Sequence, residues 1–196
     1  MNATEMRARV REDLQDTDAA TYQWTDDQVD GAIQRSVREY SLVAPIQKMD
    51  DITTTLDDKE LDISSLTGLL KIESIEHPID RSPRYYQRFA HWAGRVFMTD
   101  KGDGNNARVK WLKEHTLDAA STTIPAEHEE IIVLGATGYL AMSASVHVVD
   151  RANIAGRYGT RGFRAWGQDR LQRYDAQRKA IAHDRRTIQR TFYTDE

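Results

Sequence analysis

The sequence predicts an α+β protein, mainly a helical bundle with a small β-sandwich or barrel module inserted between the second and third helices. Two patterns predict this class. Apolar residues recur every three or four positions in residues 1–48 and 123–196, whereas residues 49–122 contain short segments of alternating polar and apolar residues. We therefore expect an N-terminal helical pair (1–48), an inserted β module (49–122), and C-terminal helices with a basic arm (123–196), the helical parts forming one bundle.

Two helices are expected before the module. Met1–Leu14 is a short first helix, with Thr4 as its expected cap and an apolar face made by Met6, Val10 and Leu14. Trp24–Ser41 contains the second helix, which Thr25 or Asp26 caps. Its buried stripe comprises Val29, Ala32, Ile33, Val37 and Tyr40. Pro45 ends this helix, because proline does not suit a helix interior.

Short strands follow in the middle of the chain. Ile52–Leu56 and Glu60–Ser64 alternate around Asp57, Asp58 and Lys59, which predicts a first hairpin. Leu70–Ile75 predicts a further strand. A second hairpin is expected from Tyr85–Trp92 and Arg95–Met98, with Ala93 and Gly94 at the turn, and Arg108–Lys113 is the last strand.

Helical spacing returns at Pro125, which suits a first helical turn, and continues to about Val149. Residues 153–162 contain three glycines and predict a flexible connection. Arg164 to about Arg186 then predicts a long peripheral helix whose narrow apolar stripe meets a partner or a neighbouring subunit. The subunit-packing residues expected in this stripe are Leu171, Tyr174 and Ile181.

The composition excludes several kinds of site and several classes of protein. The 196 residues include no cysteine, which excludes disulfides, thiolate metal sites and a cysteine nucleophile. No apolar run approaches the roughly 18 residues of a membrane span, and no secretion signal is visible, so we expect no membrane association. The expected location is the cytoplasm or a particle assembled there.

The motifs that resemble catalytic or metal sites are incomplete. His128-Glu129-Glu130 begins like a zinc-protease helix, but Ile132 stands where the second histidine is needed. Asp16 and Asp18 lack the further oxygen ligands of a calcium loop. The loop Gly156–Gly162 lacks the Gly-Lys-Ser/Thr ending of a phosphate-binding loop and is interpreted as a hinge. We therefore predict no catalytic residues, no cofactor and no metal, and a protein that is not an enzyme.

A family resemblance is carried by Met1–Leu14, the loop with Asp16, Thr17, Asp18, Tyr22 and Trp24, the helix up to Ser41, Leu61–Leu66, and Leu117-Asp118 to Glu130. These segments resemble the head-to-tail connector proteins of tailed bacteriophages, also called head-completion or adaptor proteins. The resemblance covers nearly the whole chain.

This resemblance implies a structural adaptor in the neck of a virion, between capsid and tail, that is present in host cytoplasm during assembly. Such proteins dock under the portal protein, form a dodecameric ring that extends the DNA channel, and provide the platform for a neck or tail-completion protein. The portal-docking residues expected here are Arg178, Lys179, Arg185, Arg186, Arg190, Phe192 and Tyr193. The β module is then left for the tail-side partner or the outside of the ring.

Two other functions compete with this one. Residues 151–190 contain eleven Lys and Arg against three Asp and Glu, although the whole chain has a net charge of −4. This basic arm could bind DNA without sequence preference, as an accessory protein does. A weaker alternative is a glycan-acting or glycan-binding virion protein that uses aromatic residues of the β module, namely Tyr85, Tyr86, Trp92 and Trp111.

Overall fold

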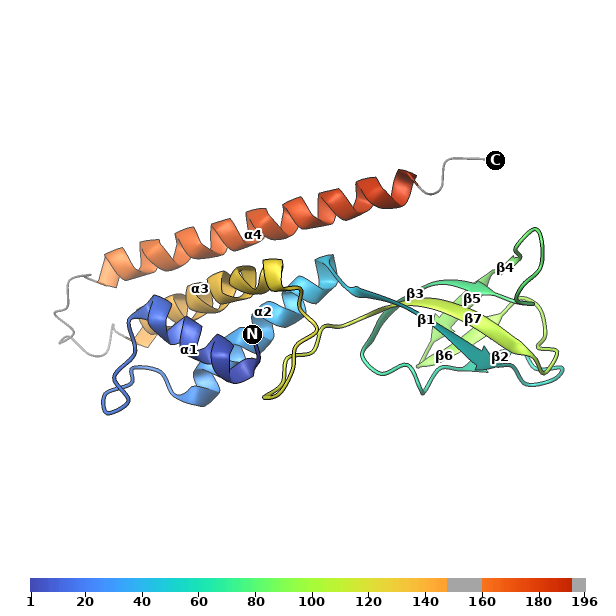
Figure 1. Ribbon diagram of the computed structural model, residues 1–196, viewed down its shortest axis with the longest axis horizontal. Helices are drawn as coiled ribbons and strands as arrows, with labels where there is room; N and C mark the ends of the chain where they lie inside the picture. The colour runs from blue at the N-terminus through green and yellow to red at the C-terminus, as the bar shows by residue number, and fades with distance from the viewer. Residues whose placement is uncertain (148–159, 192–196) are drawn as a thin grey trace. The chain divides into compact units, whose positions relative to one another are not determined.

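The computed structural model describes residues 1–147 and 160–191, with side chains described for residues 1–144 and 162–184. Its elements follow the order predicted from the sequence, with all strands between the second and third helices (Figure 1), so the α+β class is confirmed. The elements are α1 (Ala3–Leu14), α2 (Asp26–Val43), β1 (Ile46–Thr53), β2 (Glu60–Asp62), β3 (Leu69–Glu76), β4 (Tyr86–Gln87), β5 (Phe89–Trp92), β6 (Arg95–Met98), β7 (Asn106–Lys113), the 3-10 helix η1 (Ala126–His128), α3 (Glu129–His147) and α4 (Thr160–Thr191).

The chain divides into two compact units. A helical unit comprises Met1–Ala44 and His115–Glu196, and a β unit comprises Pro45–Glu114. The β unit therefore begins and ends earlier than the expected range 49–122. Residues after Glu114 pack with the helices, since the His115 N–H donates to Ser41 Oγ at 3.0 Å.

Both N-terminal helices begin with reciprocal side-chain caps. Asn2, not Thr4, caps α1: its side chain accepts from the Glu5 N–H at 3.0 Å, and the Glu5 carboxylate accepts from the Asn2 N–H at 2.9 Å. Thr4 lies inside the helix, so the cap predicted there is wrong. Of the two caps predicted for α2, Thr25 and Asp26, Thr25 is the one that forms, with Gln28 as its reciprocal partner.

The helical unit is built around α2 and α3, with α1 and α4 packed on them (Figure 1). The expected stripe of α2 is buried throughout, from Val29 to Tyr40. α4 lies along α3, and three glycines permit the close approach. Gly135 and Gly138 of α3 face Tyr174 and Leu171, while Gly167 of α4 faces Ala141.

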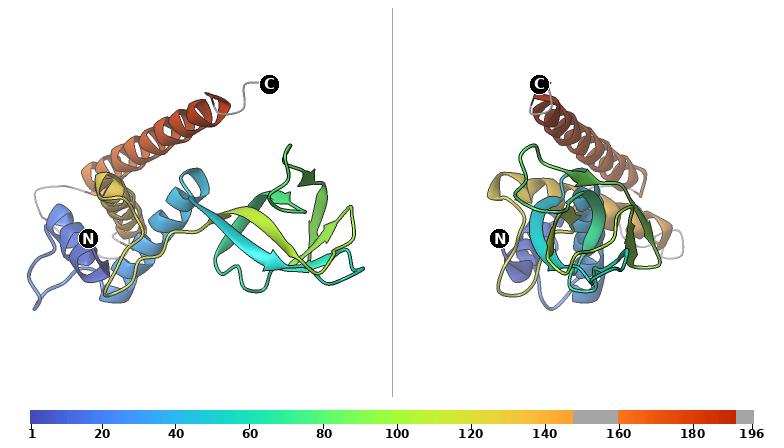
Figure 2. Two further views of the ribbon diagram at one scale, coloured as in Figure 1. Left: turned by 45° about the vertical axis from the view of Figure 1, so that its right-hand side comes forward. Right: turned by 90° about the vertical axis from the view of Figure 1, so that its right-hand side faces the viewer.

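The strands of the β unit form two antiparallel sheets, with the orders β1-β7-β3-β4 and β2-β6-β5. Figure 2 shows them curling around a shared interior. The buried residues of this interior include Leu61, Ile75, Val96, Val109 and Trp111. The sequence predicted a small β-sandwich or barrel, and the strands form two sheets over one core.

The first expected hairpin does not form, although the second does. β1 pairs along its whole length with β7, and β2 pairs with β6 in the other sheet. The turn at Asp57, with φ 63°, thus carries the chain between sheets. The strand expected over Tyr85–Trp92 is likewise divided between the two sheets at Arg88. β5 and β6 pair across the predicted turn, where Ala93 and Gly94 have φ of 50° and 74°.

No helix within the ranges 1–147 and 160–191 is long and apolar enough to cross a membrane. The flexible connection expected over residues 153–162 lies mostly outside the described residues, whereas Thr160–Gly162 already belong to α4. α4 contains the long helix predicted from Arg164 to Arg186 and extends beyond both ends of it.

Candidate interaction surfaces

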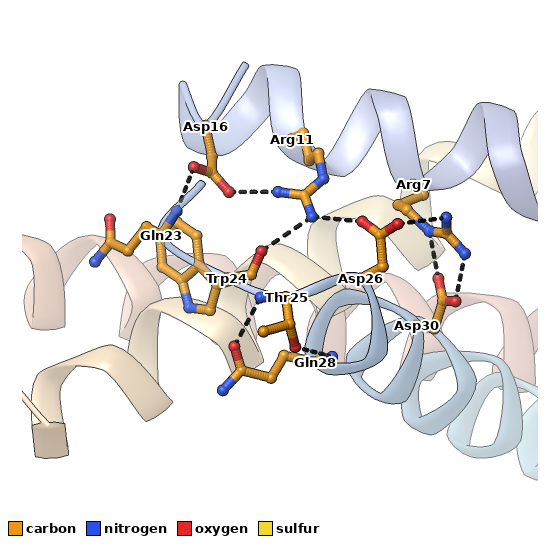
Figure 3. A network of polar contacts seen from close by, with 9 residues as sticks. All are labelled: Arg7, Arg11, Asp16, Gln23, Trp24, Thr25, Asp26, Gln28 and Asp30. Atoms are coloured by element: carbon orange, nitrogen blue, oxygen red, sulfur yellow. Dashed lines mark hydrogen bonds and ion pairs between the residues drawn. The ribbon is translucent and has the colours of Figure 1, made fainter. Parts of the chain in front are cut away.

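The loop between α1 and α2 is held by one buried arginine (Figure 3). The Arg11 guanidinium donates to Asp16 Oδ2 at 2.6 Å, to the Trp24 carbonyl oxygen at 3.0 Å and to Asp26 Oδ1 at 2.7 Å. The other oxygen of Asp16 accepts from the Gln23 N–H at 2.8 Å. Because Arg11 is only 5% exposed, these charge-assisted bonds fix the loop at both ends.

A second arginine ties the same two helices together. Arg7 Nε donates to Asp30 Oδ1 at 2.8 Å and its Nη1 donates to Asp26 Oδ2 at 3.1 Å (Figure 3). Both Arg7 and Arg11 therefore donate hydrogen bonds to the Asp26 carboxylate. The hydrogen bond from Arg11, followed by the charges of Arg7 and Arg11, lowers the pKa of Asp26. Asp16 and Trp24, two of the residues that carry the connector resemblance, thus belong to one polar network with Arg11.

The apolar stripe of α4 packs inside its own chain. Tyr174 is 1% exposed, and its hydroxyl donates to the Ser36 carbonyl oxygen at 2.7 Å. Leu171 lies against Gly138, and Ile181 packs against the helical core. Tyr174 is thus already covered by α2 and α3, whereas subunit packing by Leu171 and Ile181 stays a prediction. The narrow stripe is enough to hold α4 against α3, because small residues on α3 let the two helices approach closely.

Arg178, the first of the expected docking residues, is also engaged within the chain. Its guanidinium donates to the Glu39 carbonyl oxygen at 3.2 Å and lies 3.3 Å from Glu39 Oε2. The Tyr139 hydroxyl donates to that same carboxylate oxygen at 2.6 Å. Burial and the hydrogen bond to Glu39 raise the pKa of Tyr139 to about 12. This group joins α2, α3 and α4, which gives Arg178 a structural role.

Other basic side chains of α4 also have acidic partners. Arg170 pairs with Asp13 at 2.7 Å, while the remaining pairs lie within the helix itself. These pairs are Arg173 with Asp169 and Lys179 with Asp175. Among the described side chains of α4, Arg170, Arg173, Arg178 and Lys179 thus have acidic partners. The side chains of Arg185, Arg186, Arg190, Phe192 and Tyr193 lie outside the described residues.

The β unit exposes an apolar patch on its smaller sheet. Val96 and Met98 of β6 point into the core, so the alternate residue Phe97 faces outward, together with its cross-strand neighbours on β5. We call Ala90, Trp92 and Phe97 the hairpin patch. Trp92 is 77% exposed. Of the other aromatics considered for glycan binding, Tyr85 and Tyr86 are exposed, but Trp111 is buried in the core.

Two histidines of the helical unit, His128 and His115, serve its packing. Tyr40 OH lies 2.6 Å from His128 Nδ1, which joins α2 to the start of α3. His115 is buried, and its two ring nitrogens lie 2.8 Å from the carbonyl oxygens of Ala44 and Thr123. Within the described part of the chain, no three His, Asp or Glu residues form a group that could hold a metal ion. Sequence spacing did not reveal these contacts, because their partners are distant in the chain.

No protein-family model and no curated protein matches this chain. Among solved structures, it is similar to a chain from the neck of an empty GTA particle computed with C6 symmetry. That similarity has a TM-score of 0.32 and 10% sequence identity, over 84% of this chain and 87% of that chain.

Proposed function

We propose that this protein is a structural, non-enzymatic adaptor in the neck of a tailed-phage virion. In this function it docks under the portal, forms a ring that extends the DNA channel, and provides the platform for neck or tail attachment. The ring is dodecameric if it follows the connector resemblance.

The observation that supports this proposal best is how the segments carrying the resemblance pack together. The Ala3 N–H donates to the Asp118 carbonyl oxygen at 2.9 Å, and Arg9 Nε donates to Glu130 at 3.1 Å. These contacts join Met1–Leu14 to the segment from Leu117 to Glu130. Arg11 in turn joins α1 to the loop and to α2. Residues that are far apart in sequence thus act as a single structural element, as expected of a shared scaffold.

Portal docking is assigned to the end of the chain. Since Arg178 is engaged with Glu39, the proposed docking segment begins after it and comprises Lys179, Arg185, Arg186, Arg190, Phe192 and Tyr193. Lys179 is exposed and can change partners at low cost. The hairpin patch is the matching candidate for the neck or tail-completion protein, because exposed aromatic residues anchor many protein interfaces.

The test is the native mass of the protein, alone and mixed with the portal protein of the same phage. A ring-sized mass added to the portal is the expected result, and no added mass contradicts the adaptor function. Deleting residues 185–196 should abolish this addition while leaving the protein folded, with a helical circular dichroism lowered only by the loss of the last two turns of α4. Arg173→Ala is the matched control, because Arg173 is exposed and pairs only within α4 among the described residues. Full binding by the truncated protein would refute the assignment of the docking segment but not the adaptor function.

The alternative, an accessory DNA-binding protein, uses the same basic arm. The pairing of Arg170, Arg173 and Lys179 with carboxylates weighs against it. It predicts binding to duplex DNA that weakens steeply as salt is raised. Absence of binding at low salt would eliminate this alternative, and salt-sensitive binding without addition to the portal would favour it.

A further inference from the structure

The first strand of the β unit has an open edge. β1 is the terminal strand of the sheet β1-β7-β3-β4 and pairs with β7 over eight consecutive residues without a register shift. Six of its eight residues are exposed, and only Ile46 and Ile52 are partly buried. Met49 in its centre is 58% exposed. A long, regular edge strand of this kind is a template for pairing with another strand.

The register identifies the backbone groups that point outward. The Thr54 N–H donates to the Asn105 carbonyl oxygen at 2.9 Å, which continues the β1–β7 pairing by one residue. In an antiparallel pair, bonded residues alternate along the strand. The even-numbered residues of β1 therefore bond to β7. The N–H and C=O groups of Gln47, Met49, Asp51 and Thr53 point toward the open edge.

We propose that this edge pairs antiparallel with the β1 edge of a second copy of the chain, with Met49 opposite Met49. In this register Lys48 of each copy lies opposite Asp50 of the other, and Ile46 lies opposite Ile52. Lys48 and Asp50 then occupy non-hydrogen-bonded positions, where facing side chains approach most closely. Both ion pairs form at once because the contact is two-fold symmetric.

Charge selects this register over its neighbours. A shift of the two-fold axis by one residue places Lys48 opposite Lys48 or Asp50 opposite Asp50, and a shift to Asp51 brings two further carboxylates together. Like charges directly opposite each other on paired strands are unfavourable. The Asp50 carboxylate is held on the β7 side of β1, because its Oδ2 accepts from Trp111 Nε1 at 2.6 Å. Arg108 Nε donates to Asp51 Oδ1 at 2.9 Å, which reduces the repulsion in the Asp51 register, but that register loses both Lys48–Asp50 ion pairs.

A contact of this symmetry joins two chains and then closes, whereas a ring requires different surfaces on each side of the subunit. The β1 pair is therefore a form of the free protein. It does not depend on the adaptor function, and its test involves neither portal nor DNA.

Single cysteines test the register directly, since the chain contains none of its own. In the proposed pair the two Met49 Cα atoms are about 5.5 Å apart, a separation that a disulfide spans. Two Gln47 Cα atoms are about 14 Å apart, because they lie on neighbouring strands and four residues apart along them. Under mild oxidation, Met49→Cys should form a covalent dimer and Gln47→Cys should stay monomeric. Equal crosslinking of both variants, stronger crosslinking of Gln47→Cys, or none in either would overturn the proposal.

Charge exchange provides the second test, read from the mass of the protein as a function of concentration. Lys48→Asp should raise the dimer dissociation constant at least about tenfold, because each copy then faces a like charge. Adding Asp50→Lys should recover most of this loss by restoring opposite charges. Near-ultraviolet circular dichroism monitors the environment of Trp111, which loses its acceptor in the double variant. A wild-type protein that is monomeric at all concentrations, or a Lys48→Asp dimer of unchanged affinity, contradicts the pairing.

Discussion

Arg11 joins the carboxylates of Asp16 and Asp26 to the backbone at Trp24. Its side chain and that of Asp16 are only 6% and 7% exposed. Because little water reaches either charge, each is stabilised mainly by the opposite charge of the other. The bonds of this one side chain hold the loop between α1 and α2 in a fixed position against both helices.

Replacement of Arg11 by methionine is expected to reduce the free energy of unfolding by about 3–5 kcal/mol, because it leaves the buried Asp16 carboxylate without its cation. Urea denaturation measures the change. Arg9→Met is the control: Arg9 is 40% exposed and pairs with Glu12 and Glu130, so its loss should cost less than about 1 kcal/mol. Equal losses of unfolding free energy in the two variants would mean that the buried ion pair contributes no more to stability than the exposed ones.

Asp26 predicts a pH dependence of stability. Its arginine partners lower its pKa in the folded state. Its contribution is therefore fully present above the unfolded-state pKa, about 3.9, and is lost as the pH falls through the lower folded-state value. Between pH 6 and pH 3, Asp26→Asn should lose less stability than the wild type, as measured by urea denaturation at both pH values. Identical losses would contradict this assignment.

At the scale of elements, glycines decide how closely α3 and α4 pack. A methyl group on Gly135 would lie 2.8 Å from Ser36 Oγ and 3.0 Å from the ring of Tyr174. Neither neighbour can easily move, since Tyr174 is buried and bonded to the backbone of α2. Gly31 of α2 is different, because no atom lies within 4 Å of the position that a methyl group would take.

The same substitution should therefore have opposite effects at these two positions. Gly135→Ala is expected to destabilise the protein by about 1–3 kcal/mol through overpacking. Gly31→Ala should stabilise it by about 0.5–1 kcal/mol, because alanine loses less backbone entropy in a helix. Thermal and urea denaturation of both variants measure whether each substitution lowers or raises the stability. Stabilisation by Gly135→Ala would show that α4 does not pack on α3 as described.

At the scale of the whole molecule, the β unit is an insertion whose two ends meet in the helical unit. His115 Nε2 lies 2.8 Å from the Ala44 carbonyl oxygen, on the other side of the insertion. The core residues of the helices come only from segments before Pro45 and after Glu114. Each unit thus has a hydrophobic core of its own.

Removal of Pro45–Glu114, with Ala44 joined to His115 by a short Gly-Ser linker, should leave a folded helical unit. The ends are close enough for the linker to close without strain, and no helical core residue is lost. Circular dichroism should show helix, and thermal unfolding should remain cooperative. A non-cooperative or unfolded deletion protein would show that the helices depend on the β unit.

Sequence by itself determined the features whose causes lie within a few residues. The Thr25 cap, the end of α2 before Pro45 and the β5–β6 turn depend on local hydrogen bonds and backbone conformation, and all three were predicted. The same is true of the buried stripe of α2, since helical spacing alone selects it. The proposed docking residues beyond Arg178 also remain a sequence prediction.

Only the tertiary structure decided which of these elements meet. β1 pairs with β7, more than fifty residues away, rather than with the adjacent β2. The pairing that forms is the one that buries the inner faces of the two sheets, not the one that is nearest along the chain. The role of Arg11, the partners of Arg178 and the burial of Tyr174 likewise depend on contacts between distant segments. Spacing shows which residues share a face, but the surface that covers this face is fixed only when the whole chain has packed.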